Sequence, residues 1–156
     1  MRELVFALEF KGRAEPVAGT QHLRAAQSTA PSQTLSTVLS GDGVHARVEP
    51  AAGDTAVLES RVERFGDGTF VESGTITYGA AGSIVFETIG GGWVGPEPGG
   101  AGVVGGVLWR VTAATGRLAG AQGLITSNFT VSPTGELIDN QFARLYVPAA
   151  TAPRSN

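Results

Sequence analysis

The most constraining feature of this chain is a series of short segments, from Gly66 to Val147, in which apolar and polar residues alternate and glycines interrupt the alternation. Alternation with a period of two indicates half-buried β-strands. Two turns, at 41–43 and 66–68, repeat the tripeptide Gly-Asp-Gly, which tight hairpins prefer. Short strands joined by tight turns bury their apolar faces by closing into an up-and-down antiparallel barrel or by folding into a sandwich. The pattern therefore predicts an all-β fold.

About nine strands are predicted. The first lies at the N-terminus, where every second residue is a large apolar one: Leu4, Phe6, Leu8 and Phe10. The others are predicted at 34–40, 44–49, 56–65, 69–78, 83–89, 105–113, 124–131 and 137–147. Nine is close to the eight strands that close a small barrel around one ligand. We therefore expect a single β-barrel domain of about eight strands over residues 1–150, with a flexible C-terminal tail at 151–156.

Two segments do not alternate. Residues 11–32 are rich in Ala, Gln, Ser and Thr and contain Pro16 and Pro31, which predicts a lid-like loop or a short helix around 21–27. Residues 90–102 carry many glycines and two prolines, which do not suit a central strand, and predict a loop at the barrel rim. That loop is either a flexible connector or a gate in which Trp93 acts as an aromatic plug.

Composition excludes several classes of function. The 156 residues carry a net charge of −3 with no run of Lys or Arg, which argues against a nucleic-acid partner. The absence of cysteine excludes disulfides and thiolate metal sites. No segment is long and apolar enough for a membrane span, and Glu3 and Glu9 interrupt any signal core, so we expect a cytoplasmic protein. No P-loop, dinucleotide fingerprint or G-x-S-x-G turn occurs, and both histidines are predicted at the surface.

The C-terminal half resembles a known family. Strand-like segments from Gly74 to Tyr78 and from Gly82 to Phe86 are followed by a stretch ending in Thr-Gly-Arg-Leu-Ala-Gly-Ala-Gln-Gly, at 115–123. This arrangement resembles the allene oxide cyclase barrel family and its dirigent relatives, whose pattern is filled here by Thr115, Gly116, Gly120, Ala121 and Gly123. Two alanines, at 113 and 114, replace the two leading glycines of that pattern. Because glycines permit positive φ and close backbone packing, the stretch marks structure rather than catalysis.

The resemblance implies a calycin-like barrel that works without a cofactor. Such a barrel would bind a flexible hydrophobic intermediate, polyketide-like or oxylipin-like, and steer its cyclisation or isomerisation. Catalysis would come from holding the reacting atoms close together, with a few polar groups stabilising developing charge. Bacterial relatives look like cyclases of natural products.

Strand parity selects the candidate catalytic residues. Phe70, Glu72, Ile76 and Tyr78 share one face of their strand, and Glu87 shares a face with two apolar residues of the next. A carboxyl on an apolar inner face has a raised pKa, which suits general acid or base catalysis near neutral pH. Glu72, Glu87 and Tyr78 are therefore the candidate catalytic residues. The alternative is that this face points outward, or that the glutamates pair with arginines on the outside.

The candidate substrate-binding residues combine apolar bulk with hydrogen-bonding capacity. They are Phe70, Ile76, Trp93, Trp109, Asn128, Phe142 and Tyr146. Trp109 and the tyrosines also suit a packed core, and no spacing suggests a metal site.

Two functions remain open: a cofactor-independent cyclase or isomerase, and a non-catalytic carrier of a hydrophobic ligand. A barrel with a filled interior is a third possibility. A polar group aimed into an apolar cavity would favour chemistry. Apolar residues on both faces of the strand from Val103 to Val111 predict a homodimer or homotrimer.

Overall fold

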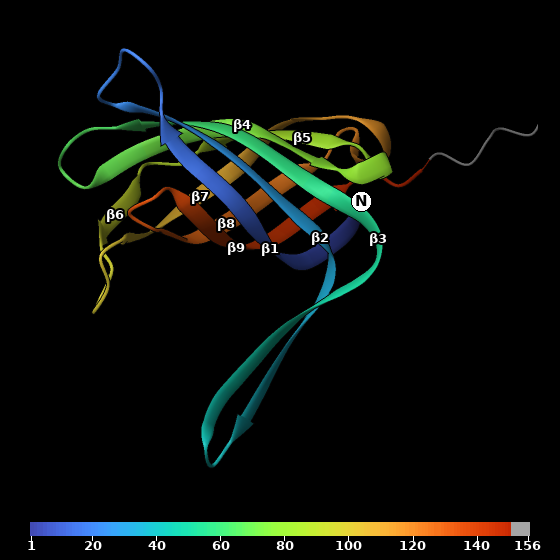
Figure 1. Cartoon of the computed structure of the whole chain (residues 1–156). Helices are drawn as coiled ribbons and strands as arrows, with labels where there is room; N and C mark the ends of the chain where they lie inside the picture. Colours follow the sequence, from blue (N-terminus) through green and yellow to red (C-terminus); the bar gives the residue numbers. More distant parts are fainter. Residues whose placement is uncertain (151–156) are drawn as a thin grey trace, which may run out of the picture.

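The computed structural model describes residues 1–150, and these form nine β-strands joined by short turns (Figure 1). The strands are β1 (Arg2–Pro16), β2 (Leu23–Ser40), β3 (Gly43–Arg64), β4 (Thr69–Tyr78), β5 (Ser83–Thr88), β6 (Gly92–Pro96), β7 (Val103–Ala114), β8 (Gln122–Val131) and β9 (Glu136–Val147). Two single 3-10 turns, η1 (Gly79–Ala81) and η2 (Gly116–Leu118), are the only helical segments in this part of the chain. The predicted tail at 151–156 lies outside the described residues.

Eight of these strands close into a ring. Each pairs antiparallel with the next in the order β1, β2, β3, β4, β5, β7, β8, β9, and β9 pairs with β1. The prediction of an all-β antiparallel sheet of about eight strands is confirmed. Both Gly-Asp-Gly tripeptides form the expected hairpin turns, one between β2 and β3 and one between β3 and β4.

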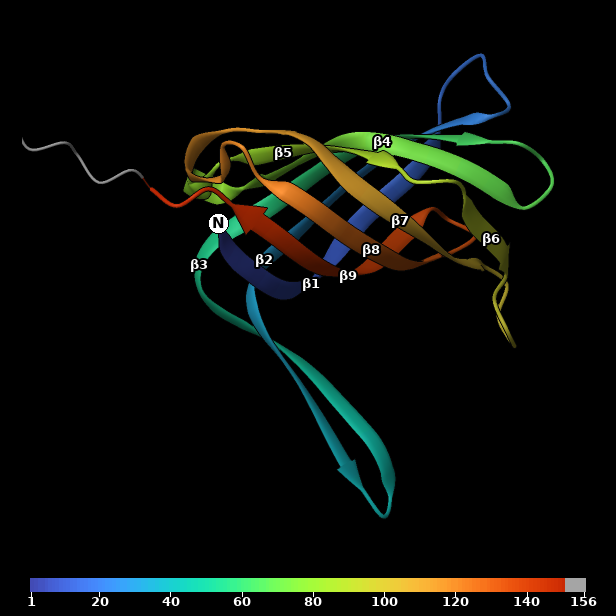
Figure 2. The same cartoon turned by 180° about the vertical axis from the view of Figure 1, so that it is seen from behind.

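The ring has one more strand at its rim than the sequence predicted. β6 lies within the segment 90–102, which was predicted to be a loop, and pairs with the start of β4 and with β7. β6 is only five residues long, and its Gly92 leaves the space that the Phe70 ring occupies, since a Cβ atom at position 92 would clash with that ring. β6 lies at the opposite end of the ring from the N-terminus (Figures 1 and 2).

The prediction for residues 11–32 is wrong. β1 continues to Pro16, and β2 begins at Leu23, so most of this segment is strand. The inner face of β2 is built from Ala26, Ser28 and Ala30. Because these inward residues are small and partly polar, the strand shows no apolar alternation in the sequence.

β2 and β3 extend beyond the ring as a hairpin arm, residues 33–50 (Figure 1). The segments 44–49 and 56–65, predicted as separate strands, belong to the one strand β3. One face of the arm carries exposed aliphatic side chains in cross-strand pairs, Leu35 with Val48 and Leu39 with Val44. The arm therefore presents an apolar face that the described chain does not cover.

The half of the ring nearer the N-terminus is filled by a packed core. Trp109 and Phe86 stack with ring centroids 4.0 Å apart, and both are buried. The 115–123 stretch closes this end, because Leu118 and Ala121 pack into the core. Its glycines at 116, 120 and 123 all have positive φ, which confirms the structural reading of this stretch. In residues 1–150 there is no helix with the length and hydropathy needed to cross a membrane.

Candidate active site

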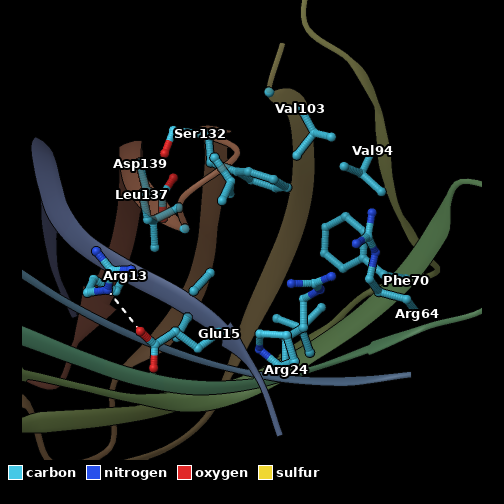
Figure 3. A pocket seen from close by; sticks show the side chains of 18 of the residues that line it. Arg13, Glu15, Arg24, Arg64, Phe70, Val94, Val103, Ser132, Leu137 and Asp139 are labelled. Atoms are coloured by element: carbon cyan, nitrogen blue, oxygen red, sulfur yellow. Dashed lines mark hydrogen bonds and ion pairs between the residues drawn. The ribbon is translucent and has the colours of Figure 1, made fainter. Parts of the chain in front are cut away.

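The interior of the ring, here called the lumen, opens into a cavity of about 730 Å³ at the end where β6 lies (Figure 3). Its wall is largely apolar and includes Leu58, Val62, Phe70, Val94 and Phe129. A volume of this size suits a small organic molecule. Three carboxyl groups also line it: the exposed Glu15 and two buried ones, described next.

Glu72 lies on the inner face of β4 and is 8% exposed. The Ser60 hydroxyl of β3 donates a hydrogen bond of 2.6 Å to Glu72 Oε1. Thr88 Oγ1 accepts a hydrogen bond from the Glu72 backbone N–H and donates one to the Glu72 carbonyl oxygen. These two bonds fix the backbone of β4 at Glu72 against β5. Burial raises the pKa of Glu72 to about 8; the Ser60 hydrogen bond lowers this pKa, and the charge of Asp139 raises it.

Asp139 is the second carboxyl group, and the sequence reasoning missed it. It lies on the inner face of β9, 4% exposed, and accepts hydrogen bonds of 2.7 Å from Ser127 Oγ and from Gln141 Nε2. Burial raises its pKa to about 6, against the lowering effect of these hydrogen bonds. Strand parity would have indicated Asp139, since it lies on the same face of β9 as the buried residues Leu137 and Gln141.

The two carboxyl groups face each other across the lumen. In the ring order, β4 and β9 are four strands apart in either direction, which is the largest separation that eight strands allow. Each carboxyl accepts a hydrogen bond from a serine of a neighbouring strand, Ser60 for Glu72 and Ser127 for Asp139. Two carboxyl groups with pKa values on either side of 7 can act as an acid and a base at neutral pH.

The inner face predicted for β4 is the one observed. Phe70 lines the cavity beside Glu72, whereas Ile76 is fully buried deeper in the core. Tyr78 packs edge-to-face on Phe6, with ring centroids 5.5 Å apart, at the filled end of the ring. Burial raises the pKa of Tyr78, which keeps its hydroxyl protonated. Tyr78 does not line the cavity, so the structure does not bring it together with Glu72.

Glu87 lies on the outer face of β5, where the Arg110 Nε donates to it at 2.8 Å. Glu87 therefore does not contact the lumen. The alternative prediction, that this glutamate pairs with an arginine on the outside, is the correct one for Glu87. Three other candidates also lie on the outer face and are exposed: Asn128, Phe142 and Tyr146. The lumen prediction for Phe142 and Tyr146 is wrong, because Ile138, Phe142 and Tyr146 are as apolar as the residues that face inward, and alternation alone does not distinguish the two faces of β9.

The two tryptophans do not line the cavity. Trp93 is 56% exposed on β6, so it does not plug the opening. Its neighbour Val94 is the residue of β6 that faces the cavity. Trp109 is fully buried and belongs to the core beneath the cavity.

Comparisons with protein-family models, with curated proteins and with solved structures gave no match to this chain. Within residues 1–150, no group of three or more His, Asp or Glu side chains is arranged to hold a metal ion. His22 and His45 are both exposed, as predicted.

Proposed function

We propose that the closed ring is an up-and-down β-barrel of the calycin or allene oxide cyclase type, and that the protein is a cyclase or isomerase that needs no cofactor. Its substrate is a hydrophobic small molecule, such as a polyketide-like or oxylipin-like biosynthetic intermediate, bound in the lumen. The observation that carries this proposal is the pair of buried carboxyl groups, Glu72 and Asp139, on opposite walls of a largely apolar cavity. Strongly shifted pKa values in a cleft are typical of functional sites.

The pKa values assign the roles. At pH 7, Asp139, with a pKa of about 6, is ionised and acts as the general base, whereas Glu72, with a pKa of about 8, is protonated and acts as the general acid. Asp139 removes a proton from an acidic C–H bond of the substrate. The released electron pair forms the new bond of the isomer, and Glu72 donates its proton to the atom that gains negative charge. The substrate loses one proton and gains one, so the product has the same composition.

The alternative is a carrier that binds a hydrophobic ligand without changing it. The apolar cavity would serve either function. A carrier has no use for two ionisable groups in that cavity, because desolvation makes their charged forms unfavourable. The two functions are distinguished by whether the carboxyl groups accelerate a proton transfer.

The elimination of 5-nitrobenzisoxazole tests this point without knowledge of the natural substrate. A base removes the proton at carbon 3 of this apolar compound. The electron pair of the C–H bond completes a nitrile, the N–O bond breaks, and the ring opens to a single coloured product, 2-cyano-4-nitrophenolate. We expect Asp139→Asn to lower the rate by roughly 10² to 10⁴, the usual contribution of a general base. The wild-type rate should rise with pH as Asp139 ionises around pH 6.

Glu87→Gln is the matched control, because it removes a carboxylate from the outer face of the ring. It should keep the wild-type rate. If Asp139→Asn and Glu72→Gln also keep that rate while both variants remain folded, the enzyme proposal fails and the carrier remains.

We also propose that the protein is a homodimer or homotrimer in the cytoplasm. The arm supports self-association, since its apolar face is exposed over both strands, with Leu39 at 75% and Val44 at 71% exposure. A second apolar area lies on the outer face of the ring around Phe142, where Val5 and Leu124 are also exposed. The β7 residues that prompted the sequence prediction contribute less, because Val107 is buried and Leu108 is half-buried.

A further inference from the structure

Two arginines lie side by side in the cavity wall. Arg24 is the first inward-facing residue of β2, and Arg64 is the last inward-facing residue of β3. Arg24 is the register partner of Val62, so Arg64 is its diagonal neighbour on the adjacent strand. Both side chains are half-buried and line the cavity, on the side where Phe70 lies (Figure 3).

Neither guanidinium group forms an ion pair or a side-chain hydrogen bond with any residue in the range 1–150. The third arginine of the cavity wall, Arg13, is engaged: its Nε donates to Glu15 at 2.9 Å and its Nη2 to the Thr134 carbonyl oxygen at 2.6 Å. Burial and the nearby charge of Arg24 lower the pKa of Arg64. Two like charges placed together in a half-buried position repel each other unless an anion lies between them.

We propose that Arg24 and Arg64 bind the anionic head group of the ligand, a carboxylate or a phosphate monoester, while its apolar body enters the lumen. This inference rests on the proposed function, because it assumes that the cavity holds a small molecule. Guanidinium groups bind both kinds of anion through paired, charge-assisted hydrogen bonds. Phe70, Val94 and Phe129 then contact the apolar body.

The register also places Glu72 close to the two arginines. Arg64 is paired with Phe70, and Glu72 is the next inward-facing residue of β4. Two residues of a strand span about 7 Å. Because the anchoring arginines and Glu72 belong to neighbouring positions of the same wall, the substrate class that fits is an amphipathic acid.

Two dyes that differ by one anionic group test the head-group site. The probe 8-anilinonaphthalene-1-sulfonate carries a sulfonate, and N-phenyl-1-naphthylamine is the same ring system without it. We expect Arg24→Gln and Arg64→Gln each to weaken binding of the anionic dye about tenfold, the usual effect of losing a charge-assisted hydrogen-bonding group, and to leave the neutral dye unaffected. Arg64→Lys should keep part of the affinity, because it keeps the charge without the paired donors.

Three further measurements make the result specific. Arg61→Gln, an equal change of charge on the outer face of the same strand, should bind both dyes as the wild type does. Ala26→Phe fills the cavity and should displace both dyes from it, which separates lumen binding from dye bound at the arm. Decanoate and decyl phosphate should compete with the anionic dye more strongly than decanol, which has the same chain without the charge, and the stronger of the two anions identifies the head group.

Equal losses for both dyes in Arg24→Gln and Arg64→Gln, or no loss for the anionic dye, would overturn the inference. The result is independent of the proposed catalysis, since it is a binding measurement. A preference for anions with no effect of Asp139→Asn on elimination would leave an acid-binding carrier. Elimination that depends on Asp139 without a preference for anions would leave an enzyme for neutral substrates.

Discussion

At the scale of the residue, the burial of Glu72 lowers the free energy of unfolding at neutral pH. Its pKa is raised by burial from 4.5 to about 8, so the folded protein retains a proton that the unfolded chain releases. Below pH 4.5 Glu72 is protonated in both the folded and the unfolded state, so its titration does not reduce stability there. As pH rises from about 4.5 to 8, the unfolded state binds fewer protons than the folded state, and stability falls by roughly 1 kcal/mol per pH unit for this group. Above pH 8 the loss is complete.

Glu72→Gln should therefore flatten the dependence of stability on pH. Between pH 6 and 8 the wild type should lose stability in urea unfolding, whereas the variant should lose much less, because glutamine does not titrate. Asp139 contributes in the same direction, but mainly between pH 3.8 and 6. Glu87→Gln, the outer-face control, should follow the wild-type curve. A Glu72→Gln curve as steep as that of the wild type would show that Glu72 is ionised in the folded protein.

At the scale of the element, the carboxyl site depends on how closely β3 and β4 approach. Gly74 lies on the inner face of β4 and is paired with Ser60, the hydrogen-bond donor to Glu72. A Cβ atom at position 74 would lie 2.8 Å from the Cβ of Ser60, which is closer than real Cβ atoms come. The absence of a side chain at Gly74 therefore allows the Ser60 hydroxyl to reach the carboxyl.

Gly74→Ala should destabilise the protein by about 1–3 kcal/mol, as overpacking does, and should also slow the elimination reaction by displacing Ser60. Gly41→Ala is the control, because Gly41 lies in the turn of the arm with no atom within 4 Å of the added Cβ. That variant should change stability by no more than about 0.5 kcal/mol. Denaturant unfolding of both variants measures the difference, and equal stabilities would contradict the close approach of the two strands.

At the scale of the whole molecule, the arm is the part of the fold that the ring does not stabilise. A two-stranded hairpin is at best marginally stable alone in water, and this one exposes an aliphatic face. Packing against a second copy of the chain would remove that face from water.

Replacing Leu39 and Val44 together by lysine should therefore convert the proposed oligomer into a monomer, because it places two charges in the buried contact. Val38→Lys is the control, since Val38 is 58% exposed and pairs with His45 on the opposite face of the arm. Analytical ultracentrifugation measures both. A wild-type particle of 15.9 kDa at every accessible concentration would contradict self-association.

Alternation and turn chemistry are local properties, and they were sufficient to predict the antiparallel strands, the two Gly-Asp-Gly hairpins and the set of residues that shares a face with Glu72. Periodicity did not reveal the strand from Leu23, because its inward residues are small. It also could not say which face of β5, β8 or β9 points inward, because both faces carry apolar residues. Only ring closure decided this. Closure turned Glu87 and Tyr146 outward and set Asp139 opposite Glu72, and the register of β2 against β3 placed Arg24 beside Arg64. These relations join residues far apart in the chain, so they depend on strand register and on the sheet closing on itself.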